Sequence, residues 1–181
     1  NSYRFVVQND DEVELRNAVS YAEGSANNPY IISSVEDYNN VFAENNSTNQ
    51  VGYIRFVNDI NFNNDEKAIK TRANYTLGSG ASSTKTSVEG NGMSISGIYL
   101  DVGQSIVQEI GLFGVIQNAY IKNLNLNFAT PTTDGQFSTT TASYSGGLAG
   151  RIENSVIINV KLSGNGTTLT GRNFVGGLAG T

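Results

Sequence analysis

Two stretches near the carboxyl end of the chain alternate strictly between apolar and polar residues. Residues 124–128 read LNLNF and residues 160–162 read VKL, so every second side chain is apolar. Successive side chains of a β-strand point to opposite faces, and a period of two therefore predicts strands with one buried face. No pattern of helical length separates the two stretches, which argues against repeats built from helices or from alternating strands and helices.

Both strand patterns belong to an internal repeat. The segment GLFGVIQNAYIKNLNLNF, which starts at Gly111, matches GLAGRIENSVIINVKLSG, which starts at Gly147, an offset of 36 residues (147 minus 111). A third copy begins at Gly177, because FVGGLAG repeats YSGGLAG 30 residues later (180 minus 150). A period of about 20 to 50 residues is typical of solenoids and propellers. Strands without helices between them favour a parallel β-solenoid with turns rich in glycine and asparagine; propeller blades remain possible but are usually longer.

Equivalent residues of the copies are expected to stack in adjacent coils, at the strand spacing of about 4.8 Å. The leucine in each copy is expected to fill the interior, and Gly114 and Gly150 are expected where a Cβ would meet neighbouring backbone. Buried asparagine amides are expected to form a ladder that fixes the register, because a slip would leave each amide unpaired. The predicted columns are Gly111, Gly147 and Gly177; Leu112, Leu148 and Leu178; and Asn123 and Asn159.

The first fifty residues have a different pattern. The segment NDDEVELRNAVSYAEGS spaces its apolar residues as a helix does, and so does SSVEDYNNVFAENN, in which Ser33 and Glu36 have the spacing of a capping box. Strands are predicted at YRFVV and PYIIS, before and between these helices. Such a unit would cover the apolar interior and unpaired edges at the end of a solenoid. The predicted organisation is a small α/β amino-terminal cap over residues 1–50 and a parallel solenoid over residues 51–181.

Composition narrows the possible partners. The 181-residue chain has a net charge of −5, and its lysines and arginines are not clustered, so no nucleic-acid partner is expected. It contains no histidine and no cysteine, which removes the commonest general base, thiol nucleophiles, the usual zinc sites and disulfides. No apolar run approaches the roughly 20 residues of a membrane-spanning helix, so membrane insertion is not expected. Abundant uncharged polar residues are typical of long secreted β-rich bacterial proteins.

The charged residues do not form a catalytic pattern. The carboxylates are scattered, and no two have the repeat-related spacing of an acid–base pair, so catalysis by this segment is not expected. GNG at 90–92 and the GGLAG units lack the lysine and hydroxyl residue of a phosphate-binding loop, and we interpret them as turns. Glu153 aligns with Gln117 and is expected to be a solvated charge in a turn. The residues considered for a catalytic groove, and set aside, are Arg55, Asp59, Asp65, Glu66, Asp101, Glu109, Arg151 and Glu153.

One segment superficially resembles a calcium-binding loop. DINFNNDE, which starts at Asp59, alternates oxygen-bearing side chains, but it has Asn64 where the loop requires glycine and Lys70 in place of the final glutamate. A strand with Ile60 and Phe62 pointing inward is the preferred interpretation, and no metal or cofactor is expected. Asn-X-Ser/Thr sequences, which would matter only after eukaryotic secretion, occur at Asn46, Asn74 and Asn165.

The tandem segments GLFGVIQNAYIKNLNL, GGLAGRIENSVIINVKLSGNGTTLTG and VGGLAG resemble the GLUG repeats of large bacterial surface proteins. The resemblance covers residues 51–181, with NDINFNN and VEGNGMSISGIYL as the lead-in, although Val160 stands where many such repeats have cysteine. It implies a mainly β fold, a right-handed single-stranded parallel β-helix of the pectin-lyase-like type. It also implies a secreted or surface-anchored protein, often an adhesin. Similar repeats occur in the amino-terminal regions of IgA-specific metalloproteases and beside carbohydrate-active domains.

The predicted function is therefore adhesion by a non-catalytic segment of a large secreted or cell-surface bacterial protein. The expected partner is a host-cell glycan or protein, met by the solenoid faces or by the loop 129–144. A second expected partner is the rest of the polypeptide carboxyl-terminal to Thr181, because an uncapped coil would leave core and edge open. The alternative is the non-catalytic amino-terminal region of a secreted protease or carbohydrate-active enzyme.

Overall fold

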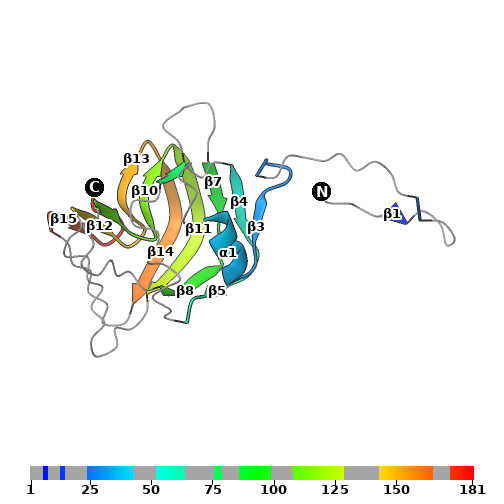
Figure 1. Ribbon diagram of the computed structural model, residues 1–181, viewed down its shortest axis with the longest axis horizontal. Coiled ribbons are helices and arrows are strands. Elements are labelled where there is room, and N and C mark those ends of the chain that lie inside the picture. Colours follow the sequence, from blue (N-terminus) through cyan, green and yellow to red (C-terminus); the bar gives the residue numbers. More distant parts are fainter. Residues whose placement is uncertain are drawn as a thin grey trace.

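The computed structural model describes residues 6–7, 13–14, 24–42, 52–63, 76–78, 86–98, 108–128, 143–164 and 172–181. Within them lie the helix α1 (Val35–Val41) and fifteen strands (Figure 1). The strands are β1 (Val6–Val7), β2 (Val13–Glu14), β3 (Tyr30–Ile32), β4 (Tyr53–Phe56), β5 (Ile60–Asn61), β6 (Thr76–Gly78), β7 (Thr86–Glu89), β8 (Ser94–Ile98), β9 (Glu109–Ile110), β10 (Phe113–Gln117), β11 (Ala119–Phe128), β12 (Tyr144–Gly146), β13 (Ala149–Glu153), β14 (Val156–Gly164) and β15 (Phe174–Gly176).

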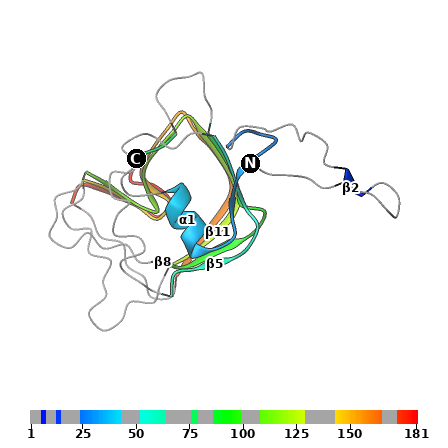
Figure 2. The same cartoon turned by 45° about the vertical axis from the view of Figure 1, so that its right-hand side comes forward.

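Strands β3 to β15 form three sheets in which the paired strands are parallel. The largest has the order β3-β4-β7-β11-β8-β5, with β14 also paired to β11, and the smaller ones are β6-β10-β13 and β9-β12-β15. In Figure 2 the strands of successive layers nearly overlie one another around a common interior. The described part of the chain is therefore mainly β with parallel sheets, as the sequence predicts.

The register of these sheets reproduces the 36-residue repeat. Strand β10 pairs with β13 so that Ile116 lies beside Ile152, and β11 pairs with β14 so that Ile121 lies beside Ile157. The side-chain hydrogen bond between the asparagines of the two copies likewise joins residues 36 apart. Equivalent residues of the two copies are thus neighbours in adjacent layers, which confirms the predicted stacking.

The leucines of the repeat point into the interior, as predicted. Leu112 and Leu148 are fully buried, and Leu148 N donates a hydrogen bond to Leu178 O at 2.9 Å. Leu178 is 40% exposed, because only one described layer covers it. Leu124 and Leu126 are also fully buried, which confirms the inward phase predicted for LNLNF.

Two repeat glycines are required by close packing. A Cβ at Gly111 would lie 2.5 Å from Ala149 Cα, and a Cβ at Gly150 would lie 2.7 Å from Ile110 N, distances that real Cβ atoms do not reach. Neither glycine has a positive φ, so its role is to admit neighbouring backbone. The prediction that a Cβ would meet neighbouring backbone is thus confirmed for Gly150. Gly114 is buried within β10.

Helix α1 lies across one end of the interior that the sheets surround (Figure 2). Tyr38 of the helix and Phe42, its C-cap residue, are fully buried. The ring centroid of Phe42 lies 5.3 Å from that of Phe113 in β10, and the ring centroid of Tyr38 lies 5.0 Å from that of Phe62. Aromatic side chains of the helix therefore close the apolar core at this end.

The start of α1 differs by one residue from the predicted capping box. Ser34 is the N-cap, and its hydroxyl accepts a hydrogen bond from Asp37 N at 3.1 Å. The predicted cap, Ser33, instead donates from its hydroxyl to the Asp37 carboxylate at 2.6 Å. That hydroxyl bond is the main reason that the pKa of Asp37 is lowered, and the Ser33 amide together with the hydroxyl and amide of Ser34 lowers it further.

The amino-terminal prediction needs two further corrections. Val13–Glu14 is a strand paired antiparallel with Val6–Val7, so the first predicted helix is wrong at these residues; the rest of its segment, apart from Gly24 and Ser25, lies outside the described residues. The short valine-containing sequence fits a strand as well as a helix, and pairing of Val7 with Val13 decides for the strand. Tyr30–Ile32 is a strand as predicted, but it pairs in parallel with β4, so the parallel sheet begins before residue 51.

Candidate functional site

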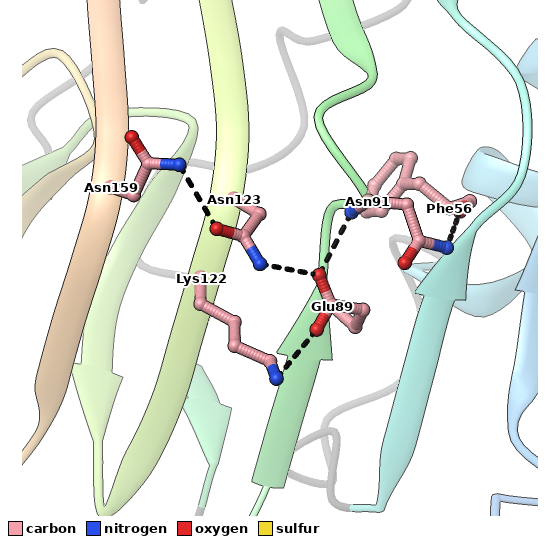
Figure 3. A network of polar contacts seen from close by, with 6 residues as sticks. All are labelled: Phe56, Glu89, Asn91, Lys122, Asn123 and Asn159. Atoms are coloured by element: carbon pink, nitrogen blue, oxygen red, sulfur yellow. Dashed lines mark hydrogen bonds and ion pairs between the residues drawn. The ribbon is translucent and has the colours of Figure 1, made fainter.

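A chain of polar side chains crosses three adjacent strands of the largest sheet (Figure 3). Glu89 of β7 accepts a hydrogen bond from Asn123 Nδ2 of β11 at 3.0 Å. Asn123 Oδ1 in turn accepts one from Asn159 Nδ2 of β14, also at 3.0 Å. Lys122 Nζ lies 2.7 Å from Glu89 Oε2. We call these four residues the asparagine ladder.

The backbone conformation of its asparagines explains where the ladder lies. Asn123 and Asn159 have φ values of 57° and 50°, in the left-handed region that asparagine tolerates better than most residues. The left-handed residue bends the strand, so that Ile121 and Leu124 both point inward although they are three positions apart. The predicted stack is confirmed. The prediction that its amides are buried is wrong, because Asn123 at the bend is half-buried and Asn159 is exposed.

The GNG segment forms a turn, as predicted, and supports the ladder. Met93 N donates to Gly90 O at 2.8 Å, and Asn91 has a φ of 52°. Asn91 N donates to Glu89 Oε1 at 2.9 Å, and Asn91 Nδ2 donates to Phe56 O at 2.7 Å. The turn therefore ties the Glu89 carboxylate to the layer before it (Figure 3).

Two opposing effects set the ionisation of Glu89. Partial desolvation raises the pKa of its carboxyl, but the hydrogen bonds from Lys122, Asn123 and Asn91 N together with the Lys122 charge lower it by more, so the net shift is downward. The same contact with Glu89 raises the pKa of Lys122. The ladder is therefore anchored on an ionised carboxylate at neutral pH.

A second charged cluster joins two sheets. Arg151 of β13 lies 2.6 Å from Glu153 Oε1 through Nη1 and 3.4 Å from Glu109 Oε1 of β9 through Nη2. Gln117 Nε2 donates to Glu153 Oε2 at 2.8 Å. The prediction for Glu153 is wrong, because it ends strand β13 and is half-buried in an ion pair, not solvated in a turn. The arrangement is that of a partly buried ion-pair network between β9 and β13.

The calcium-loop candidates are engaged in local hydrogen bonds. Asp59 Oδ1 accepts from Ser94 N at 2.8 Å, and Asn61 Oδ1 accepts from Asn63 N at 2.8 Å. The buried side chains of Ile60 and Phe62 confirm the strand interpretation. No group of three or more potential metal ligands occurs in the part of the chain that the structure describes.

The other sequence candidates are not brought together. Arg55 is exposed on β4, in register with Glu89. Of the predicted loop 129–144, residues 129–142 lie outside the described residues, and the prediction is wrong at Tyr144, which begins strand β12. The remaining candidates also lie outside the described residues. These are Asp65, Glu66, Asp101, Asn46, Asn74 and Asn165.

The largest sheet exposes apolar side chains on its outward side, a feature that the sequence analysis missed. Tyr53, Ser87, Tyr120 and Val156 are in register in one outward column. The neighbouring column contains Ile31 and Ile158 at its ends, with Arg55, Glu89 and Lys122 between them. Lys122 Nζ lies 5.9 Å from the ring centroid of Tyr120. We call the exposed residues Ile31, Tyr53, Tyr120, Val156 and Ile158 the outer face.

Comparison with known proteins shows a similarity to a much longer protein. The chain is similar to halomucin of Haloquadratum walsbyi, with 30% identity over 172 residues. The match covers 91% of the chain but 2% of halomucin, so the chain spans a very small part of that protein. No family model matches the sequence. No solved structure is significantly similar to it.

These comparisons and the fold agree at a coarse level. The β-rich structure and the similarity to halomucin are compatible with a secreted or cell-surface location. In the residues that the structure describes, no helix has the length and apolar character needed to cross a membrane. The resemblance to GLUG repeats stays a prediction.

Proposed function

We propose that the chain is a non-catalytic segment of a large secreted or cell-surface bacterial protein that acts as an adhesin. Its parallel layers are coils of a right-handed single-stranded β-helix of the pectin-lyase-like type. This proposal is supported by the 36-residue register between β10 and β13 and between β11 and β14. Stacked layers of this kind form a stiff scaffold whose long faces suit contact with extended ligands.

The exposed apolar side chains of the outer face are the observation that supports a role in binding. Larger exposed apolar patches that are rimmed by polar residues mark interaction sites, and the outer face combines exposed apolar side chains with charged ones. Tyr53 and Tyr120 are 43% and 36% exposed and occupy one column with Ser87 between them, so they lie two strand spacings, roughly 10 Å, apart. Tyrosine combines an apolar ring with a polar hydroxyl, and this suits sugar rings and protein surfaces alike. The ligand is a host-cell glycan or protein.

The remainder of the polypeptide carboxyl-terminal to Thr181 is the other partner in this proposal. Phe174, Val175 and Leu178 are exposed in the last described layer. A further layer that covers these side chains would bury them as the inner layers bury theirs. The binding segment would then belong to a longer stack on the cell surface.

Binding of the purified chain to a glycan array and to host cells tests the adhesin proposal. A double variant, Tyr53→Ser with Tyr120→Ser, should weaken binding at least about tenfold, because central aromatic residues carry most of the energy of such contacts. Phe174→Ser is the matched control, since it removes an exposed aromatic side chain from a different sheet.

Circular dichroism must show that the variants remain folded. The adhesin proposal fails if the wild-type chain binds neither glycans nor cells. If the double variant binds as tightly as the Phe174→Ser control, the outer face is not the binding surface.

A further inference from the structure

The hydrogen bonds of the asparagine ladder run in one direction. The ionised Glu89 carboxylate can only accept, so Asn123 must turn its Nδ2 toward it. This leaves Asn123 Oδ1 facing the next layer, where it accepts from Asn159 Nδ2. Asn159 therefore presents its Oδ1, an acceptor, on the side away from Glu89. The carboxylate at one end of the ladder thus fixes the orientation of every amide that follows.

Other asparagines, within or next to strands of the same sheet, follow this direction independently. Their partners are backbone carbonyls, which can only accept, so the orientation of each amide is again forced. In each case the donor belongs to the later layer and the acceptor to the earlier one. These bonds are Asn58 Nδ2 to Ser33 O at 3.1 Å, Asn91 Nδ2 to Phe56 O at 2.7 Å, and Asn125 Nδ2 to Gly92 O at 2.7 Å.

The last layer is open on the side that these acceptors face. Strand β14 pairs with β11 alone among the described strands, which leaves its outer edge without a strand partner there. Asn159 is exposed, and so is the apolar side chain of Leu178 in the GLAG unit that follows; Val156 and Ile158 of β14 are exposed on the outer face. An unpaired strand edge flanked by exposed apolar side chains is a site for strand addition.

We propose that this end is a docking site for one further parallel layer that carries asparagine in register with Asn159. The Nδ2 of that asparagine would donate to Asn159 Oδ1, and its strand would pair with β14. Aspartate at the same position would place an acceptor against an acceptor, and leucine would leave Asn159 Oδ1 without a partner. The ladder thus specifies the residue as well as the register of the incoming layer.

A second copy of the chain does not meet these requirements. At its opposite end Tyr38 and Phe42 cover the interior, and the edge strand β3 contains no asparagine that could donate to Asn159 Oδ1. Two copies joined through their open ends would place one Asn159 Oδ1 against the other, both acceptors. The occupant is therefore a further repeat of the same type. This inference is independent of the adhesin proposal, because it rests on hydrogen bonds and not on a ligand.

An extended chain provides the test. A copy of residues 152–180 appended after Thr181 continues the third GLAG unit with one more layer. The extension should raise the thermal midpoint and the urea midpoint of the chain. Replacing the copied Asn159 by Asp should abolish most of that gain. Replacing the copied Arg172 by Gln changes the net charge by the same amount at an exposed position and should leave the gain intact.

Equal midpoints for the Asn and Asp extensions would overturn the proposal, and so would an extension that gives no gain at all. Sedimentation of the unextended chain tests whether a second copy binds at the open end. A monomer over the micromolar range is the expected result. A dimer that Asn159→Asp leaves intact and Leu178→Asp dissociates would show that the open end binds a second copy instead.

Discussion

The apolar interior of the stacked layers is covered at one end and open to solvent at the other. At one end, α1 places Tyr38 and Phe42 against the core, and both are fully buried. At the other end, Phe174, Val175 and Leu178 are between 40% and 52% exposed. Both ends belong to one continuous parallel arrangement, so the contrast lies in what covers each end.

The contrast shows that burial here depends on the layer more than on the residue. Leu148 and Leu178 occupy the same position of the motif GLAG, yet the first is fully buried and the second is 40% exposed. In stacked repeats each layer is stabilised mainly by its neighbours, so a side chain contributes fully only where layers lie on both sides. Equivalent residues should therefore differ widely in their contribution to the free energy of unfolding.

The largest difference is expected between phenylalanines at the two ends. Phe42→Ala should lower the free energy of unfolding by about 3–5 kcal/mol, because it opens a cavity between α1 and Phe113. Phe174→Ala should cost about 1 kcal/mol or less, since Phe174 is exposed and loses mainly its stacking on Tyr144. Urea unfolding followed by circular dichroism measures both. Equal losses would contradict the idea that α1 closes the core.

A pair of leucines tests the same contrast within one motif. Leu148→Ala should cost about 2–5 kcal/mol as a core truncation, and Leu178→Ala should cost clearly less because that site is already open to solvent. Lys161→Ala, on the exposed side of β14, is the control and should change stability by less than about 0.5 kcal/mol. If the two leucine variants lose equal and small amounts of stability, the interior column has been misassigned.

The sequence predicted the repeat layers best, because their order is encoded locally. Alternation placed Leu124 and Leu126 inward, and the 36-residue offset brought Asn123 beside Asn159. Each of these features follows from the period of a strand and from like residues stacking on like. The Glu89 anchor was missed because its layer lies outside the clear repeat, and because Glu89 is in register with Lys122, not with the asparagine that it contacts.

Features that depend on the angle between sheets could not be predicted. Glu109 meets Arg151 because β9 and β13 come together in space, and nothing in their sequence spacing signals this. The exposure of Tyr53 and Tyr120 likewise needs the register of β4, β7 and β11, which repeat poorly in sequence. A short segment such as Val13–Glu14 carries too few residues for its period to separate strand from helix.

The cap of α1 is expected to have a smaller effect than its aromatic side chains. Ser34→Ala removes the acceptor for Asp37 N and should lower the free energy of unfolding by about 0.5–2 kcal/mol. Ser34→Asp should restore most of the loss, because aspartate is an equally good N-cap. Hydrogen exchange of the Asp37 amide localises the change to the closed end. Unchanged exchange in Ser34→Ala would show that the cap does not hold the helix.

The smallest effect concerns Glu89, from which the ladder runs toward the open end. Its pKa is lower in the folded chain than in the unfolded chain, where it lies at about 4.3. Glu89 therefore stabilises the fold above that pH, and this contribution is lost as the pH falls through the lower folded-state value.

Glu89→Gln should reduce stability at pH 7 by about 1 kcal/mol or less, since the ion pair with Lys122 is partly exposed. The difference from wild type should shrink toward zero in acid. Asp37, whose pKa is also lowered, titrates in both proteins and so cancels in the comparison. Urea unfolding at a series of pH values measures the difference, and a gap that stays constant down to pH 3 would show that the Glu89 charge does not anchor the ladder.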